Sequence, residues 1–442
     1  MRRTLARDLA TPTPNPSPQG GGEQYVRRGF CPGLSAPMQT GDGLLVRLLP
    51  TGTISLAAFA ELCAAARNHG NGIMEITARG SIQVRGLNAA SAPRFADSIA
   101  ALDIAAADGI AVLTDPLAGL AAEQILDANA LAADLRRALA RISVAASLAA
   151  KISVAVDGGG ALNLDGLAAD VRLRAMRIDG DDALLLSVGG DGASAAELGA
   201  VALPHGVDAA LRLLEFIARH GRGTRAKDIV AAEGIAAFRS AVADLLIVDA
   251  ASRVAHRAGE AIGMHRLRDG SFACGIGVAF GHADADVLRC FTEVAQSFGA
   301  GGMRPAPDRT LMIVGLAQDT LSEFAGDAER LGFIVHADDL RRRVIACAGA
   351  PVCASGHLAA RDLAPVIASS LASLGERAST IHISGCAKGC AHPAPAALTI
   401  VGTAAGCALV ENGSTRDAPF ATVPLYRLPD AVASVVREGR HV

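Results

Sequence analysis

An 18-residue segment occurs twice in this chain of 442 residues, and the repeat constrains the possible folds more than any other feature. Gly70–Leu87 aligns without a gap to Gly299–Leu316, and the copies share three glycines, a methionine and a final leucine at equivalent positions. An apolar stretch and a helical pattern precede each copy, and a second helical pattern follows each one. The sequence therefore predicts one structural unit present twice.

The order of the predicted elements indicates which unit this is. Apolar residues spaced three and four apart indicate helices, and short apolar runs indicate strands. Around the two copies the pattern predicts strands at 44–49 and 275–280, first helices at 56–68 and 285–297, and second helices at 92–102 and 321–331. Strand, helix, strand, strand, helix, strand is the order of a ferredoxin-like α+β unit. We expect two such units, related by a pseudo-twofold axis.

Each predicted repeat leads into a further α/β module, whose first strands are expected at Lys151-ISVAVDGGG and at Val344–Ala346. A chain of this length has room for several domains. The expected division is a flexible Pro/Gly/Ser-rich tail at 1–25, the first ferredoxin-like repeat at 26–115, a first α/β module at 116–260, the second repeat at 261–342 and a cysteine-bearing α/β module at 343–442.

Composition excludes several classes of protein. Hydrophobic residues make up 51% of the chain and charged residues 19%, which is typical of a globular protein. The longer apolar runs are interrupted by polar residues, and the N-terminus lacks the apolar core of a secretory signal, so we expect no membrane span and a cytoplasmic protein. The net charge of −3 and the absence of a basic run with interleaved aromatics give no indication of nucleic acid binding.

Four of the nine cysteines form two close pairs, Cys347/Cys353 and Cys386/Cys390. An odd number of cysteines without an export signal favours reduced thiols, which can serve as metal ligands. Each pair follows a strand-like stretch and lies among glycines that permit tight turns. Ser355 is expected to cap a helix that starts near His357. The spacing favours a 4Fe-4S cluster, with structural zinc or unrelated buried cysteines as alternatives.

The cysteine pattern carries a family resemblance. Cys-x5-Cys followed by Gly-Cys-x-x-Gly-Cys, after the second of two ferredoxin-like repeats, resembles the sulfite and nitrite reductase family from about Gly29 to about Gly406. In that family the four cysteines hold a 4Fe-4S cluster against a siroheme. Two stretches, GFCPGLSAPMQTGDGLLVRL from Gly29 and CAKGCAHP from Cys386, more closely resemble the precorrin-3B synthase branch of aerobic cobalamin synthesis.

The cations that the reductases place around their small oxyanion are only partly kept. Arg79 and Lys151 match family positions, but Ser153 replaces a second lysine and LTDPLAG at 113–119 replaces an Arg-Asn stretch. Since each charge-assisted contact contributes roughly 1.5–3 kcal/mol, losing half of them should weaken the binding of a small dianion by several kcal/mol. This favours a larger substrate.

The resemblance implies that the substrate is precorrin-3A, a tetrapyrrole with many carboxylates. The implied reaction is an O2-dependent hydroxylation at C20, with formation of a γ-lactone from a neighbouring acetate side chain. Cations dispersed round a wide pocket would then bind the substrate. For Arg85 and Arg309 a solvated surface charge is an equal alternative. The candidates on or near the repeat strands are Arg47, Arg79, Arg85, Lys151, Arg304 and Arg309.

The cluster would relay electrons in this branch, so O2 must be activated elsewhere. The resemblance implies a mononuclear non-haem iron, which needs two histidines and a carboxylate. His357 and His392, near the cysteine loops, are the candidates, with ordinary surface histidines as the alternative. No G-x-G-x-x-G follows a strand in a βαβ context, so electrons from NADH would arrive through a separate electron-donor protein.

Two other functions stay open on the sequence alone. The first is a siroheme-dependent sulfite or nitrite reductase, in which Cys390 would bridge the cluster and the siroheme iron. The second is a non-catalytic iron-sulfur or zinc protein, although two halves around a central pocket are more than such a protein needs.

Overall fold

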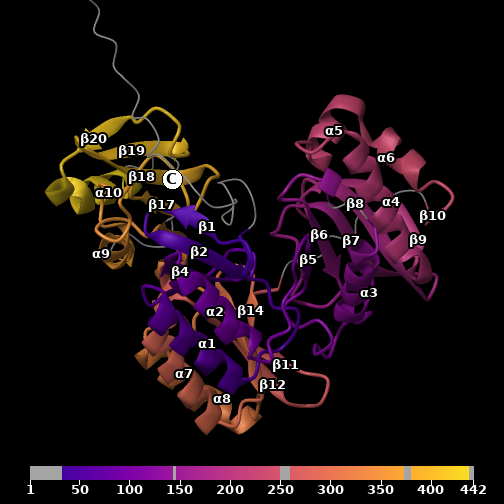
Figure 1. Ribbon diagram of the computed structural model, residues 1–442, viewed down its shortest axis with the longest axis horizontal. Coiled ribbons are helices and arrows are strands. Elements are labelled where there is room, and N and C mark those ends of the chain that lie inside the picture. The colour runs from indigo at the N-terminus through magenta and orange to yellow at the C-terminus, as the bar shows by residue number, and fades with distance from the viewer. Residues whose placement is uncertain (1–31, 143–145, 249–258, 373–379, 438–442) are drawn as a thin grey trace, which may run out of the picture.

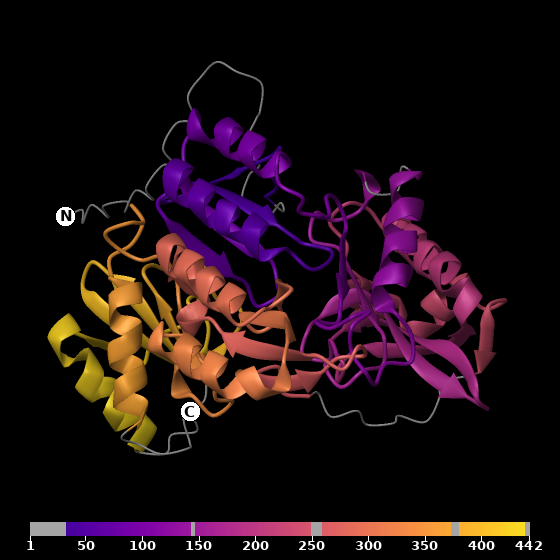
Figure 2. The same ribbon diagram turned by 90° about the horizontal axis from the view of Figure 1, so that it is seen from below.

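The computed structural model describes residues 32–142, 146–248, 259–372 and 380–437. The two ferredoxin-like repeats lie between two α/β modules, with the cysteine-bearing module next to β1 and β2 and the other module on the opposite side (Figures 1 and 2). No helix within these four ranges is long and apolar enough to cross a membrane.

Both repeats consist of antiparallel strands covered by two helices. The first contains β1 (Met38–Thr40), β2 (Gly43–Leu48), α1 (Leu56–His69), β3 (Ile73–Ile76), β4 (Ile82–Leu87) and α2 (Ser91–Ala100). The second contains β11 (Gly263–Arg266), β12 (Phe272–Gly277), β13 (His282–Asp284), α7 (Ala285–Ser297), β14 (Gly302–Ala306), β15 (Thr310–Leu316) and α8 (Leu321–Arg330). The sheet orders are β1-β2-β4-β3-β13 and β11-β12-β15-β14.

The pairing between the repeats shows the duplication directly. Ala283 in β13 pairs with Met74 in β3, and Ile54 forms an isolated bridge with Met303 in β14. These two contacts correspond under the offset that relates Gly70 to Gly299, so each half extends the sheet of the other. The helices α1 and α7 pack together, and both halves share one hydrophobic core that includes Phe59, Phe95, Phe291 and Phe324. The predicted pseudo-twofold fold is confirmed.

Two details differ from the expectation. The strand predicted at 275–280 runs from Phe272 to Gly277, because a 3-10 turn with Phe280 at φ 59° follows it. The fourth strand expected in each repeat is reduced to an isolated bridge, Pro50 with Ala106 and Gly277 with Ile334. The place beside the first strand that this fourth strand would take is occupied by β1 in one half and β11 in the other.

The two α/β modules share one topology. The first contains β5 (Ala111–Thr114), α3 (Ala128–Ala140), β6 (Ser153–Asp157), β7 (Ala169–Ile178), β8 (Asp181–Gly190), β9 (Ala196–Ala202), α4 (Gly206–Arg219), α5 (Ala226–Glu233), α6 (Ile235–Ala241) and β10 (Leu246–Val248). The second contains β16 (Val344–Ala346), α9 (Ala360–Ala372), β17 (Ile381–Ser384), β18 (Ala396–Thr403), β19 (Gly406–Gly413), β20 (Ala421–Val423) and α10 (Leu428–Arg437). Both sheets have two parallel pairs followed by two antiparallel pairs, and the first sheet adds a third antiparallel pair between β9 and β10.

One residue range is assigned differently by the sheets. The division proposed from the sequence places 111–114 in the first repeat, but β5 pairs in parallel with β6 and so belongs to the sheet of the first module.

Short 3-10 helices lie at Leu203–His205, Ala279–Gly281, Gln318–Thr320, Leu340–Arg343 and Leu425–Arg427.

Candidate functional site

The two cysteine loops start at the same edge of the second module. Because β16 and β17 are parallel neighbours, the loops that follow their carboxyl ends lie side by side. The N–H of Cys347 donates to the carbonyl of Ile383 at 3.1 Å, and the N–H of Gly385 donates to Sγ of Cys347, also at 3.1 Å. Burial raises the pKa of the Cys347 thiol, and the nearby Cys390 and Cys386 raise it further. Three of the four paired cysteines are therefore electrostatic neighbours.

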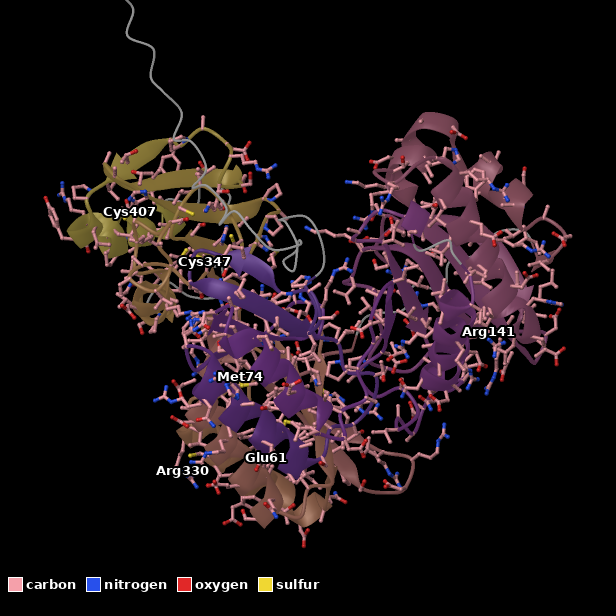
Figure 3. All side chains as sticks on the ribbon, in the orientation of Figure 1. Glu61, Met74, Arg141, Arg330, Cys347 and Cys407 are labelled. Atoms are coloured by element: carbon pink, nitrogen blue, oxygen red, sulfur yellow. The ribbon has the colours of Figure 1, made fainter. Side chains whose placement is uncertain are left out.

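Cys353 lies under the turn between β1 and β2. The N–H of Ala354 donates to the carbonyl of Gly41 at 2.9 Å, and a Cβ added at Gly41 would collide with Sγ of Cys353. Figure 3 shows Cys347 at this junction of the second module with β1 and β2. The loop of Cys353 is thus covered by the first repeat, whereas Cys390 in the second loop is exposed.

The chemistry of the four donors suits an iron-sulfur cluster, since thiolates are its usual ligands and a main-chain N–H already points at one sulfur. The two loops use glycines with positive φ, 63° at Gly349 and 59° at Gly389, which a side chain would strain. Within the described ranges, no three His, Cys, Asp or Glu side chains are close enough to hold a metal ion as they stand. The donor set fits such a group, although the side chains do not yet converge on one point.

The helix cap expected at Ser355 is not present. α9 begins at Ala360, and the Ser355 hydroxyl instead accepts a hydrogen bond from Nζ of Lys388 at 2.7 Å. This contact ties the first cysteine loop to the second, and the N–H of His357 adds another by donating to the carbonyl of Gly385 at 2.7 Å. Polar contacts between the loops replace the predicted cap.

A buried group of charges lies beside the cysteine loops. Arg85 donates to Asp42 through two nitrogens at 2.7 Å and to Glu75 at 3.4 Å, and Arg361 from α9 donates to Glu75 at 3.2 Å. Burial would lower the pKa of Arg85, but Glu75 and Asp42 outweigh it and hold that pKa above its ordinary value, with a further contribution from Cys390. These ion pairs connect β3 and β4 to the cysteine-bearing module.

Arg85 is only 9% exposed, so the solvated alternative considered for it is wrong. The side chain of Arg309 is also largely buried, and burial lowers its pKa. Its main chain has a positive φ of 61°. Arg47 extends the charged group because it donates to Gln83 at 2.8 Å, and Gln83 donates to Glu75 at 2.7 Å. Three of the six predicted cations therefore lie within or next to internal polar groups.

Two histidines near the second cysteine loop face each other. The ring centroids of His382 and His392 are 5.7 Å apart, and His382 is fully buried with neither ring nitrogen hydrogen-bonded in the described structure. Burial, followed by the charge of His392, lowers the pKa of His382 to about 4, so its ring is neutral at neutral pH. The iron-ligand candidate His392 thus contacts His382.

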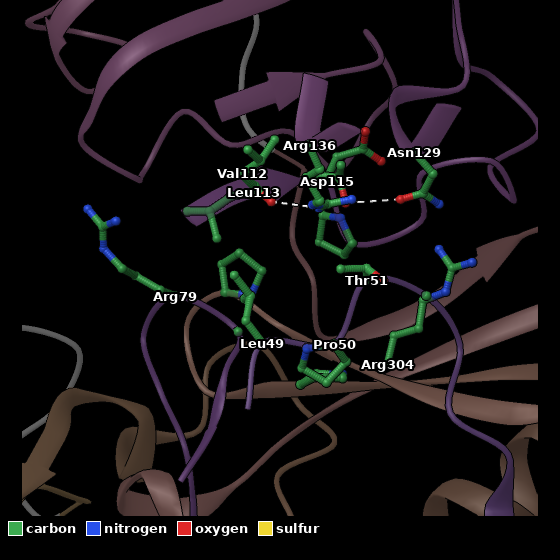
Figure 4. Close-up of a pocket in the computed structure, with 16 residues that line it drawn as sticks. Leu49, Pro50, Thr51, Arg79, Val112, Leu113, Asp115, Asn129, Arg136 and Arg304 are labelled. Atoms are coloured by element: carbon green, nitrogen blue, oxygen red, sulfur yellow. Dashed lines mark hydrogen bonds between the residues drawn. The ribbon is translucent and has the colours of Figure 1, made fainter. Parts of the chain in front are cut away.

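The remaining predicted cations lie toward the first module. Arg79, on the β3–β4 hairpin, donates to the carbonyl of Ala168 at 2.5 Å, and Arg304 donates to Thr53 at 2.7 Å. Both line a cavity between the repeats and the first module, together with Asp115 (Figure 4). Lys151 is exposed in the turn before β6.

The chain resembles known proteins in both sequence and fold. The family described as the nitrite/sulfite reductase ferredoxin-like half domain matches residues 36–102 and 265–330, which are the two repeats. A precorrin-3B synthase from Sinorhizobium sp is 37% identical over 413 residues, covering 93% of this chain and 89% of the relative. The chain belongs to the precorrin-3B synthase family.

Two further matches extend the comparison beyond the precorrin-3B synthase family. Sulfite reductase [ferredoxin] 2 from Mycolicibacterium paratuberculosis is 28% identical over 137 residues, covering 29% of this chain and 25% of the reductase. The solved structure of the Mycobacterium tuberculosis NirA protein matches with a TM-score of 0.73 at 21% identity, covering 89% of this chain and 80% of that chain. At this identity the structural match shows the fold alone, and it confirms the reductase-like architecture of this precorrin-3B synthase family member.

Several residues of the site were not identified from the sequence. Asp42, Glu75 and Arg361 form the charged group at the cysteine loops, and Arg136 and Asp115 line the cavity. Each is a single charged residue without a local motif, and only the tertiary fold brings them together. Asp115 lies in the LTDPLAG stretch, whose departure from the reductase pattern was the one available signal.

Proposed function

We propose that this chain inserts one atom of O2 into precorrin-3A to form precorrin-3B, an oxidoreductase step of cobalamin biosynthesis. The observation that carries the proposal is the 37% identity to a precorrin-3B synthase over 93% of the chain, which includes both cysteine loops. The paired cysteines and the partial loss of the reductase cations are consistent with it.

Cys347, Cys353, Cys386 and Cys390 are proposed to hold a 4Fe-4S cluster. Such a cluster supplies one electron at a time when bound. The chain's own part is to supply the thiolates, to orient Cys347 through the N–H of Gly385 and to cover the loop of Cys353 with the turn at Gly41. The cationic side chains of Arg85 and Arg361 lie close enough to stabilise the added negative charge.

The reaction has a definite balance. One oxygen atom of O2 enters the substrate and the other leaves as water, which consumes two electrons and two protons. We propose that the electrons come from NADH through a separate electron-donor protein. We also propose that the protein acts in the cytoplasm, where its thiols stay reduced. The double bond between C20 and the neighbouring ring carbon is consumed: the inserted oxygen becomes the C20 hydroxyl and takes the proton of the acetate carboxyl, while the acetate oxygen bonds to the neighbouring carbon and closes the lactone.

The substrate is proposed to be held by dispersed cations. Arg79 and Arg304 line the cavity between the repeats and the first module, and Lys151 is exposed on that module. Arg47, Arg85 and Arg309 would act from the side of the cysteine loops, where their present partners are largely internal. A large anion with several carboxylates can contact cations that are this widely dispersed, whereas a small dianion cannot.

The non-haem iron implied by the resemblance is not supported by the residues present. His357 bonds to the second loop through its main chain, and His392 contacts His382 rather than a carboxylate. No group of three metal-binding side chains includes them in the described part of the chain. We therefore assign no step to such an iron.

The visible spectrum of anaerobically purified protein, with iron and sulfide counts, tests this proposal against the reductase alternative. We expect a broad iron-sulfur absorption, about four irons with matching sulfide, and no tetrapyrrole band before substrate is added. A bound siroheme would contradict the proposal, and one zinc without sulfide would contradict the cluster.

A further inference from the structure

A small cavity lies where the repeats meet the first module. Its volume is about 40 Å³, which is more than the roughly 10–15 Å³ that a cavity needs to hold one water molecule. The loop after β2, the β3–β4 hairpin, the end of β5, helix α3 and strand β14 with its following turn all contribute to its walls (Figure 4). The prolines in these walls are Pro50, Pro116, Pro305 and Pro307, which restrict the main chain around the cavity.

Two arginines in the wall bind only uncharged acceptors. Arg136 on α3 donates from Nη2 to the carbonyl of Val112 at 2.7 Å, and its buried Nε has no hydrogen-bond partner in the described structure. Arg304 donates to the hydroxyl of Thr53 at 2.7 Å and to the carbonyl of Ala118 at 2.8 Å. Burial lowers the pKa of both side chains, yet a guanidinium stays protonated at neutral pH. The cavity is therefore a partly buried site whose arginines carry positive charge and hydrogen-bond to uncharged acceptors.

One acidic residue, Asp115, lies among the residues that line the cavity. Its Oδ2 accepts a hydrogen bond from the N–H of Gly158 at 3.1 Å. Burial, followed by the charge of Asp157 at the end of β6, raises the pKa of Asp115 to about 7, while Arg304 from β14 opposes the shift. Near neutral pH the carboxyl is only partly ionised, so the net charge of the cavity stays positive.

We propose that this cavity is the subsite for one carboxylate side chain of the tetrapyrrole, bound by Arg136 and Arg304. This inference rests on the proposed function, because it assigns one arm of the proposed substrate. The cavity is small, so the proposal places one carboxylate arm inside it and the macrocycle outside. The positive charges of Arg136 and Arg304 attract a carboxylate, since the hydrogen-bond acceptors that they have now are uncharged.

The test compares two adjacent arginines on α3. Arg136→Gln should raise KM for precorrin-3A by about 10- to 100-fold, since it removes a charge-assisted contact, and should change kcat by less than about threefold. Arg137→Gln is the matched control, because Arg137 is exposed and pairs with Asp134. Arg136→Lys, which keeps the charge but loses the fork, should give an intermediate KM. Equal KM values for the Gln variants would overturn the subsite.

The subsite and the proposed function can fail separately. The affinity for precorrin-3A in the absence of O2, measured by fluorescence, tests the subsite even if no turnover occurs. A wild-type chain that binds precorrin-3A but never oxygenates it would contradict the proposed function. A larger dissociation constant for Arg136→Gln than for Arg137→Gln would still support the subsite. Thermal unfolding of both variants verifies that each is folded, and Arg304→Lys provides a second probe if Arg136→Gln does not fold.

Asp115 adds a pH dependence to the same experiment. As pH rises through about 7 the Asp115 carboxyl ionises and repels the bound carboxylate, so KM of the wild type should increase between pH 6 and 8.5. Asp115→Asn keeps an acceptor for the N–H of Gly158 but cannot ionise, and its KM should be nearly constant over that range. The same slope in both proteins would contradict an anionic ligand in this cavity.

Discussion

At the residue scale, the charged group at the cysteine loops shows how partners decide the role of a side chain. Arg85 alone could have been a surface cation or a substrate ligand. The carboxylates of Asp42 and Glu75 are within hydrogen-bond distance of it, and this position follows from β3 and β4 pairing beside the β1–β2 turn. Sequence patterns fix which strand a residue occupies, but not which distant carboxylate it meets.

Glu75 accepts hydrogen bonds from Arg85, Arg361 and Gln83 at once. Glu75→Gln should therefore lower the free energy of unfolding by about 3 kcal/mol, because it leaves two buried guanidinium groups without their shared carboxylate. Urea denaturation measures this loss. The control is Glu293→Gln, which removes an exposed pair with Arg289 and should cost less than about 1 kcal/mol. Similar losses in the two variants would contradict the assigned role of Glu75.

At the scale of elements, the repeats could be predicted because their signals are local. Helical periodicity placed α1, α2, α7 and α8 within a few residues of their observed bounds. The fourth strand of each repeat could not be excluded from the sequence, since β1 and β11 compete with it for the same strand edge only in the folded protein. The Ser355 cap was wrong for a similar reason: Lys388, more than thirty residues away, takes the hydroxyl.

The cysteine loops belong to β16 and β17, and each should be needed for the cluster. Cys386→Ser should lower iron and sulfide to less than about a tenth of the wild-type content and abolish turnover, because a serine hydroxyl replaces a thiolate ligand. Cys290→Ser, on α7 and away from the loops, should keep both. Iron and sulfide assays with the visible spectrum give the result, and full cluster content in Cys386→Ser would remove this residue from the ligand set.

At the scale of the whole molecule, the two similar halves carry different side chains at their candidate sites. The two modules keep one sheet topology, yet only the second carries paired cysteines, and only the first contributes α3 to the arginine-lined cavity. The duplicated architecture was predictable from the repeated glycines. The cavity was not, because its walls come from five segments far apart in the sequence.

The contact between the first repeat and the cysteine-bearing module can be tested at one position. Gly41→Ala should displace the loop of Cys353, since the added Cβ meets the sulfur of Cys353. Cluster content should fall by at least about half, while the sheets of the first repeat and the cysteine-bearing module stay folded. Gly166→Ala, where an added Cβ meets open space, should leave cluster content unchanged. Circular dichroism verifies folding, and an unchanged iron content in Gly41→Ala would show that the turn does not position Cys353.

Isotopic labelling tests most directly whether the protein oxygenates precorrin-3A with O2. Anaerobically purified protein is mixed with precorrin-3A and a reductant, isotopically labelled O2 is admitted, and the product is analysed by mass spectrometry. We predict a hydroxylactone that is heavier than the substrate by one oxygen atom and carries one atom of label. An unchanged precorrin-3A, or a product whose new oxygen comes from water, would contradict the account.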